Sequence, residues 1–181
     1  MRRAPPVSPT GWRSVIETDR LRLVPLSSAD ADEMFGILAD AELHELIGGA
    51  PLSRVGLRER YQRLEVGASA DGSEVWANWI VRLRAEDIAI GAVQATIRAS
   101  SAELAWVIGT AWQGHGYAGE AAQVLAAWLE RAGVTRLTAH IHPQHTASQR
   151  TARRAGLRPT ALLDSDGEMI WNNEADADRR R

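Results

Sequence analysis

The strongest structural signal in this chain is a glycine-rich turn that leads directly into a long amphipathic helix. The sequence YAGEAAQVLAAWLERA at 117–132 repeats apolar residues at helical spacing, and Gly133 follows where many helices end in a left-handed residue. Three glycines precede or open this helix in a G-x-G-x-x-G pattern, namely Gly114, Gly116 and Gly119. Because the first amides of a helix lack partners and carry partial positive charge, these glycines would let a phosphate approach them closely.

A turn of this kind has three interpretations: glycines that only satisfy backbone geometry, a dinucleotide site, or a coenzyme A site. A dinucleotide fold places its first glycine directly at the end of a strand, and an acidic residue near the end of the following strand. Here Gly114 lies several residues beyond Ile108, which ends the preceding predicted strand, and the following strand RLTAHIH ends in His142 without a carboxylate. The sequence therefore argues against NAD.

The periodicity of the remaining chain predicts a mixed α/β (α+β) fold. Alternating apolar and polar residues predict strands, whereas apolar residues three and four apart predict helices. The predicted order is a strand at 15–26, helices from 27 or 28 to 38 and at 53–66, strands at 74–84, 88–98 and 102–108, the helix at 117–132, a strand at 135–142, a helix at 146–155, and strands at 158–164 and 168–172. Three sequential antiparallel strands followed by strand–helix alternation indicate a mostly antiparallel sheet flanked by helices on both faces.

Length and composition fit one globular domain. At 181 residues the chain can bury roughly two-thirds of its unfolded surface. We expect the folded domain at 15–172, between a flexible Pro-rich arm at 1–14 and a disordered tail at 173–181. A net charge of −2 gives no reason to expect nucleic acid or a membrane as the partner. The lack of cysteine, of a signal sequence and of a membrane-spanning apolar run predicts a cytoplasmic protein.

The side-chain inventory limits the chemistry further. His140, His142 and His145 lie in AHIHPQH without carboxylate companions or helical H-x-x-x-H spacing, so we expect no metal site. All 21 basic residues are arginine, so the chain carries no lysine amine that could itself be acylated.

Three segments resemble the GNAT superfamily of acyl-CoA N-acyltransferases. Gln113, Gly116 and Ala118 match its Q/R-x-x-G-x-G/A motif. The segments ETDRLRLVPL, AELAWVIGTAWQGHGYAGEA and IHPQHTASQRTARRAGLRP are similar to the RimJ/RimL-type branch, which acetylates amines including protein N-termini. The resemblance covers about residues 15–172 in the family's order of elements, and it implies the GNAT fold and acetyl-CoA as the acetyl donor.

The resemblance also implies where acetyl-CoA lies. Backbone amides at the start of the helix would hold its pyrophosphate, and the pantetheine arm would pair with the strand before it, which splays from the strand at 135–142. The implied cofactor-binding residues are Trp106, Val107, Ile108, Gln113, Gly114, His115, Gly116, Tyr117, Ala118, Gly119 and His145. His145 stands where the branch usually has an asparagine, which puts that contact in question.

Candidate catalytic residues follow from the chemistry of acetyl transfer. An amine must lose a proton to attack, so Glu103 at the start of the 102–108 strand is the candidate base; the alternative is a solvent-facing strand residue. Many superfamily members use a tyrosine as the acid, but Ala152 occupies that position here. RimJ/RimL-like sequences carry a serine at the position of Ser148, which would hydrogen-bond or protonate the thiolate; the alternative is a serine that bonds the helix backbone.

The acceptor site is expected beside the central strands. Trp76, Trp79 and Trp106 could wall a pocket there, with Asn78 as an amine contact, although core packing explains most such aromatic residues.

We therefore expect direct acetyl transfer from acetyl-CoA to a primary amine, because no cysteine is present for a covalent intermediate. The amine could belong to a protein N-terminus, an amino acid or a small molecule. The alternative is a non-catalytic module that binds or senses acyl-CoA. A homodimer is compatible with either function.

Overall fold

The structure is a computed structural model that describes residues 12–174, without the side chains of residues 45–47. Most of the expected N-terminal arm and C-terminal tail lies outside the described residues. Trp12, which falls within the expected arm, is only 3% exposed and its ring contacts Trp128 edge-on, with centroids 5.2 Å apart. The packed domain thus already includes this residue.

Within the described residues, eight strands form one mixed sheet in the order β1-β2-β3-β4-β5-β6-β8-β7. The strands and helices are β1 (Ile16–Glu17), β2 (Leu21–Pro25), α1 (Ala31–Leu38), α2 (Ala41–Ile47), α3 (Arg54–Glu65), β3 (Val75–Leu83), β4 (Ala89–Arg98), β5 (Ser101–Ile108), α4 (Tyr117–Arg131), β6 (Arg136–Ile141), α5 (Thr146–Arg154), β7 (Arg158–Leu163) and β8 (Met169–Asn172). The predicted mixed sheet, mostly antiparallel and flanked by helices, is confirmed.

Two details differ from the sequence-based prediction. The strand expected at 15–26 is a short hairpin, because the amide of Thr18 donates to the carbonyl of Leu21 and turns the chain between β1 and β2. Helix α2 was not predicted; Asp40 precedes it and caps it, because the Asp40 side chain accepts a hydrogen bond from the Glu42 amide. The helix α1 follows a short 3-10 turn that Ser27 caps, as one of the two expected serines.

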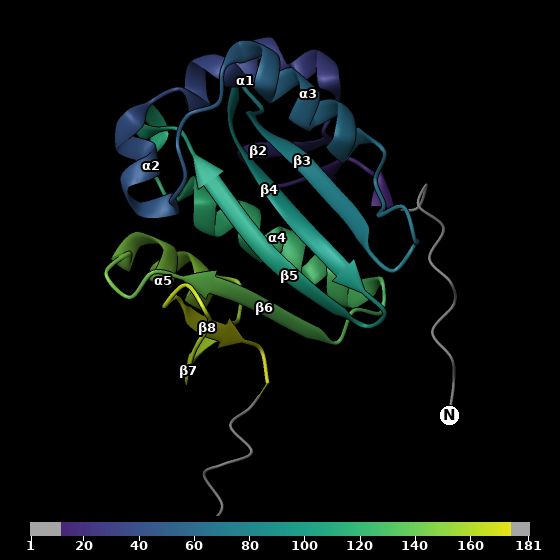
Figure 1. Ribbon diagram of the computed structural model, residues 1–181, viewed down its shortest axis with the longest axis vertical. Coiled ribbons are helices and arrows are strands. Elements are labelled where there is room, and N and C mark those ends of the chain that lie inside the picture. The colour runs from purple at the N-terminus through teal and green to yellow at the C-terminus, as the bar shows by residue number, and fades with distance from the viewer. Residues whose placement is uncertain (1–11, 175–181) are drawn as a thin grey trace, which may run out of the picture.

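The sheet opens at its centre. β5 and β6 are its parallel pair, and they pair only from Ser101 to Glu103 against Arg136 to Thr138. Beyond Glu103, β5 continues to Ile108 without a partner on that side, and Figure 1 shows the two strands diverging. The expected splay between these strands is therefore present.

The alternation of side chains along the strands separates two packed layers. On β3, Ala77, Trp79 and Val81 join the main core beneath α4, whereas Ile80 joins a second cluster with α1 and α3. In Figure 1, α4 crosses behind β3–β5, and α1–α3 lie at the upper ends of these strands. One face of the opened sheet is thus filled by α4, and the other carries the helical layer α1–α3.

Candidate active site

The gap between β5 and β6 leads into a cavity of about 460 Å³, which we call the helix-end cavity because the N-termini of α4 and α5 border it. Its lining comprises Leu43, Trp106, Val107, Ile108, Trp112, Gln113, Gly114, Gly116, Tyr117, Ala118, Gly119, His145, Ala147, Ser148, Arg150, Thr151 and Arg154. The structure therefore brings together ten of the eleven residues that the sequence analysis assigned to the cofactor. The exception is His115, which is exposed and stacks on Tyr117.

Both helices that border this cavity begin without a side-chain cap. Ser27, Asp40 and Ser53 each accept a hydrogen bond from a backbone amide at the start of their helices, but Gly116 and His145 provide none for α4 and α5. Gly116 adopts a left-handed conformation with φ of 79°, which glycine tolerates best. The first amides of α4 are consequently left to bind a group in the cavity.

A partly buried carboxylate fixes the position of the α4 N-terminus. Glu120 accepts hydrogen bonds from the Thr18 hydroxyl at 2.5 Å and from the Arg20 guanidinium at 2.5 and 2.8 Å. Arg20 also donates to the carbonyl of His115 and lies over the Tyr117 ring. Burial alone would raise the pKa of Glu120, but the bonds from Thr18 and Arg20 outweigh it and leave this pKa lowered. The glycine turn is therefore tied to the β1–β2 hairpin.

The helix-end cavity is positively charged. Arg150 and Arg154 lie one turn apart on α5 and both line it, and none of its described lining residues is Asp or Glu. Gly119 allows the Arg154 side chain to pass close to α4, since a Cβ at this position would meet the Arg154 Cδ at 2.7 Å. Two guanidinium groups and an uncapped helix start together fit a diphosphate group.

Ser148 lines the same cavity beside Trp106. Its Oγ accepts a hydrogen bond from the indole Nε1 of Trp106 at 3.2 Å. An indole nitrogen can only donate, so the serine hydroxyl proton stays available for another acceptor. His145, at the start of the same helix, has a lowered pKa because of burial and, to a smaller extent, the neighbouring His142, so its ring is neutral at pH 7. Ala152 is fully buried.

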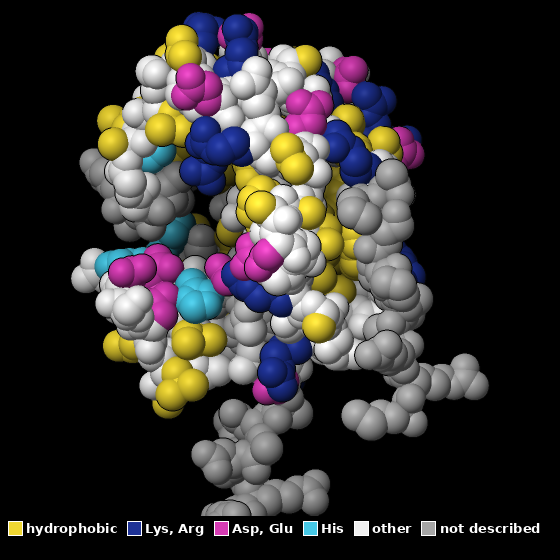
Figure 2. All heavy atoms as spheres, turned by 45° about the vertical axis from the view of Figure 1, so that its right-hand side comes forward, with side chains coloured by type: hydrophobic (Ala, Val, Ile, Leu, Met, Phe, Trp, Pro, Cys, Tyr) yellow, Lys and Arg dark blue, Asp and Glu magenta, His cyan; other side chains and the backbone are white. Residues whose placement is uncertain are grey.

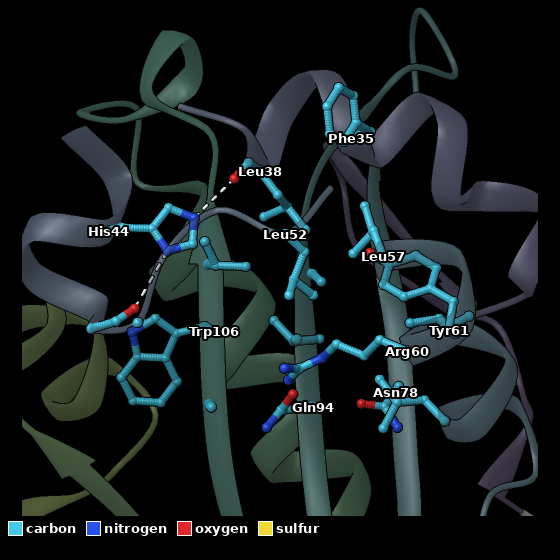
Figure 3. Close-up of a pocket in the computed structure, with 18 of the residues that line it drawn as sticks. Phe35, Leu38, His44, Leu52, Leu57, Arg60, Tyr61, Asn78, Gln94 and Trp106 are labelled. Carbon is cyan, nitrogen blue, oxygen red and sulfur yellow. Dashed lines mark hydrogen bonds between the residues drawn. The ribbon is translucent and has the colours of Figure 1, made fainter. Parts of the chain in front are cut away.

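A second cavity of about 550 Å³ lies between the helical layer and the opposite face of the sheet, and we call it the sheet-face cavity. It shares Trp106 and Val107 with the helix-end cavity, so the two meet at β5. Figure 2 shows a hollow between the helical layer and the C-terminal part of the molecule. Apolar side chains from α1, α3 and the strands form most of its wall, and Asn78, Gln94 and Arg60 supply polar groups (Figure 3).

The residues predicted for the acceptor site separate into two groups. Asn78 and Trp106 line the sheet-face cavity. Trp76 is on the same face of β3 but lies outside this cavity, and its Nε1 donates to Glu74. Trp79 is a core residue instead: it is fully buried, its ring packs edge-on against Trp128, and its Nε1 donates to the Ser14 carbonyl. Alternation along β3 turns it away from the cavity.

Glu103 does not meet Ser148 in this structure. Its side chain is 48% exposed, lies 3.7 Å from the Arg98 guanidinium and lines neither of the two cavities. Three residues of extended strand, or about 10 Å, separate it from Trp106, which contacts Ser148.

A further expectation from the sequence, that His140 has no carboxylate companion, is wrong, while the expected lack of a metal site stays a prediction. His140 does have carboxylate companions, because the β7–β8 turn brings Asp164 and Glu168 to it, and single ligand atoms of the three residues lie within 4.8 Å of one another. His140 Nδ1 is 2.6 Å from the Asp164 carboxylate, and this hydrogen bond, with those from the backbone amides of Glu168 and Asp166, lowers the pKa of Asp164. The three residues lie outside both cavities.

Sequence comparison gives one informative match. A family model described as "Acetyltransferase (GNAT) domain" matches residues 20–158, which covers most of the chain. A comparison with curated protein sequences returns no match. None of the helices at residues 12–174 is both long and apolar enough to cross a membrane.

Solved structures with the same fold are numerous. A GNAT-family acetyltransferase from Bacillus anthracis superposes with a TM-score of 0.73 at 19% identity, over 88% of this chain and 97% of the other. A candidate ribosomal-protein-serine acetyltransferase from Vibrio cholerae gives 0.67 at 22%, over 88% and 96%. The enzyme AAC(6')-Ib, solved with paromomycin and acetyl-CoA, gives 0.71 at 16%, over 85% and 92%.

Proposed function

The chain belongs to the GNAT acetyltransferase family, and on that basis we propose that it transfers the acetyl group of acetyl-CoA directly to a primary amine, with the helix-end cavity as donor site and the sheet-face cavity as acceptor site. Acetyl-CoA-dependent acetyl transfer is the activity of this family. The two cavities meet at Trp106 and Val107, beside the Ser148 hydroxyl. This observation supports the assignment of one cavity to the donor and the other to the acceptor.

The donor would be held mainly by groups already in place. The uncapped amides of Tyr117, Ala118 and Gly119, with Arg150 and Arg154, face one cavity and would bind the diphosphate of coenzyme A. Gln113 supports this turn by donating to the Ile108 carbonyl at 3.0 Å. The unpaired edge of β5 from Ala105 to Ile108 offers backbone groups to the amides of the pantetheine arm.

When bound, acetyl-CoA supplies a thioester carbon that an amine can attack. In the overall transfer an N–C bond forms, the C–S bond breaks, one proton leaves the amine, and the thiolate gains one. Ser148 is suited to the last step, because Trp106 donates to its oxygen and leaves its own proton free for the sulfur. Ala152 has no group that could replace it.

Glu103 remains our candidate for the proton acceptor at the amine, acting at a distance. Its separation of about 10 Å along β5 means that its carboxylate can reach an amine beside Trp106 only through intervening water.

We also assign the chain to the RimJ/RimL-like branch and to the cytoplasm. The serine at position 148, which lines the helix-end cavity, supports the branch. His145, which stands where an asparagine is usual, lines the same cavity as a neutral ring and can still donate a hydrogen bond. A homodimer stays a prediction.

The test combines turnover with coenzyme A affinity. Purified protein is given acetyl-CoA and a panel of amines, thiol release is followed, and coenzyme A binding is measured by calorimetry. Gly116→Glu places a carboxylate at the uncapped helix start and should weaken coenzyme A binding by at least about 10-fold.

The matched control is Gly133→Glu. Gly133 also has a positive φ, 94°, and it follows the other end of α4, so the variant carries the same backbone strain and the same charge far from the cavity. Equal losses of coenzyme A affinity in both variants would contradict the proposed position of the pyrophosphate at the start of α4. Tight coenzyme A binding without thiol release from any amine would instead support the non-catalytic binding module.

A further inference from the structure

One exposed cation, Arg60, lines the sheet-face cavity and has no described carboxylate beside it. In Figure 3, Arg60 extends from α3 across the cavity, and its guanidinium lies over Gln94. Arg54 and Arg58 of the same helix both pair with Asp32 on α1. Within the described part of the chain, no acidic side chain forms an ion pair with Arg60, and none lines the cavity.

On the side of the helices the cavity is mostly apolar, with His44 of α2 and Tyr61 of α3 as polar side chains, and its floor on the strands is polar. Phe35, Leu57 and Leu64 present hydrocarbon surfaces from α1 and α3. Asn78 and Gln94 lie side by side on β3 and β4, where they are directly paired, and can orient a polar group through their amides. A volume of about 550 Å³ is within the range of a small-molecule site.

We propose that the acceptor is a primary amine that carries a carboxylate on an apolar body, of which an apolar α-amino acid is the simplest member. This inference rests on the proposed acetyl transfer. The carboxylate would pair with Arg60, which can bind it through two parallel N–H groups, and the apolar body would contact the α1 and α3 side chains. The amine would then face Trp106 and Val107, where the helix-end cavity begins.

The same charge pattern disfavours polycationic acceptors. AAC(6')-Ib was solved with paromomycin, which carries several ammonium groups, and such a ligand needs carboxylates around it. The sheet-face cavity offers a guanidinium instead.

The test compares amines that differ only at the carboxylate. Phenylalanine, phenylalaninamide and phenethylamine share one apolar body, and a short peptide with an amidated C-terminus and paromomycin complete the panel. Thiol release from acetyl-CoA gives kcat/KM for each, and calorimetry in the presence of coenzyme A gives the affinity for phenylalanine. We expect phenylalanine to be acetylated best.

The variant Arg60→Gln isolates the carboxylate contact. It should lower kcat/KM for phenylalanine by about 10- to 100-fold, mainly through KM, and should leave phenethylamine nearly unaffected. Arg63→Gln is the matched control, because Arg63 is on the same helix and does not line the sheet-face cavity. It should leave both substrates unchanged.

The outcomes separate the two proposals. Turnover that is equal or better with phenethylamine, with the amidated peptide or with paromomycin would overturn the carboxylate inference while acetyl transfer stands. An Arg60→Gln variant that binds and acetylates phenylalanine like wild type would do the same. Failure to acetylate every amine would overturn the proposed function, and the inference with it.

Discussion

Gly91 offers a direct test of how closely β4 must approach β5. The residue pairs with Ile108, and a Cβ placed on it would lie 2.1 Å from the Val107 carbonyl oxygen and 2.9 Å from the Ile108 Cα. These neighbours are backbone atoms, so the strand itself must move by about 1.3 Å to bring the carbonyl oxygen from 2.1 Å to the 3.4 Å of ordinary contact. Its φ is not among the positive ones, and the Gly91→Ala substitution therefore isolates the steric effect.

The magnitude follows from this overlap. Overpacking of this kind costs about 1–3 kcal/mol of unfolding free energy, which in a chain of this length lowers Tm by about 2–12 °C. Val107 lines both cavities, so a shift of this size in β5 should also lower kcat/KM, by up to about 100-fold.

The assay is thermal unfolding by circular dichroism together with steady-state kinetics. Gly36→Ala is the control: Gly36 lies inside α1 with no atom within 4 Å of a Cβ, so alanine should stabilise the helix by about 0.5–1 kcal/mol. A Gly91→Ala protein with unchanged Tm and unchanged kcat/KM would refute the argument that this close approach shapes the site.

Two further substitutions address the chemistry and its support. Ser148→Ala should lower kcat about 10- to 100-fold while the coenzyme A affinity measured by calorimetry stays near wild type; an unchanged kcat would remove the hydroxyl from the mechanism. Glu120→Gln should cost about 1–3 kcal/mol of unfolding free energy at pH 7, because the bonds from Thr18 and Arg20 lose their charge. The pKa of Glu120 is lowered in the folded state, so its contribution to the unfolding free energy is present above about pH 4.3 and is lost as pH falls through the folded pKa. The unfolding free energies of the two proteins, measured by urea titration, should therefore converge in acid. A difference between them that persists in acid would contradict this assignment.

Most of the fold could be predicted because its signals are local. The period of α4, the alternation of β3–β5 and the turn residues between them act within short stretches of sequence. Helix α2 was missed because its seven residues are too few for a clear repeat. The same alternation could have excluded Trp79 from the acceptor site, since it places Asn78 and Trp79 on opposite faces of β3.

The site was predictable where a motif encodes it and not elsewhere. The glycine turn marked the start of α4, and two of the four predicted acceptor residues, Trp76 and Asn78, lie on the face of the sheet that carries the sheet-face cavity. Arg60 could not be distinguished in sequence from its neighbours on α3, because only the packing of α3 against α1 decides which arginine is paired. His140 and Asp164 are 24 residues apart, so no local spacing connects them.

The uncapped starts of α4 and α5 leave the domain incomplete without a ligand. A serine or aspartate cap contributes about 1 kcal/mol, and the chain uses such caps at Ser27, Asp40 and Ser53 but not at the two helices that face the helix-end cavity. The anion that binds there would supply the missing acceptor atoms, so the most stable form of this protein is the liganded one. Resistance to heat and to proteases should consequently rise and fall with the concentration of free coenzyme A around the enzyme.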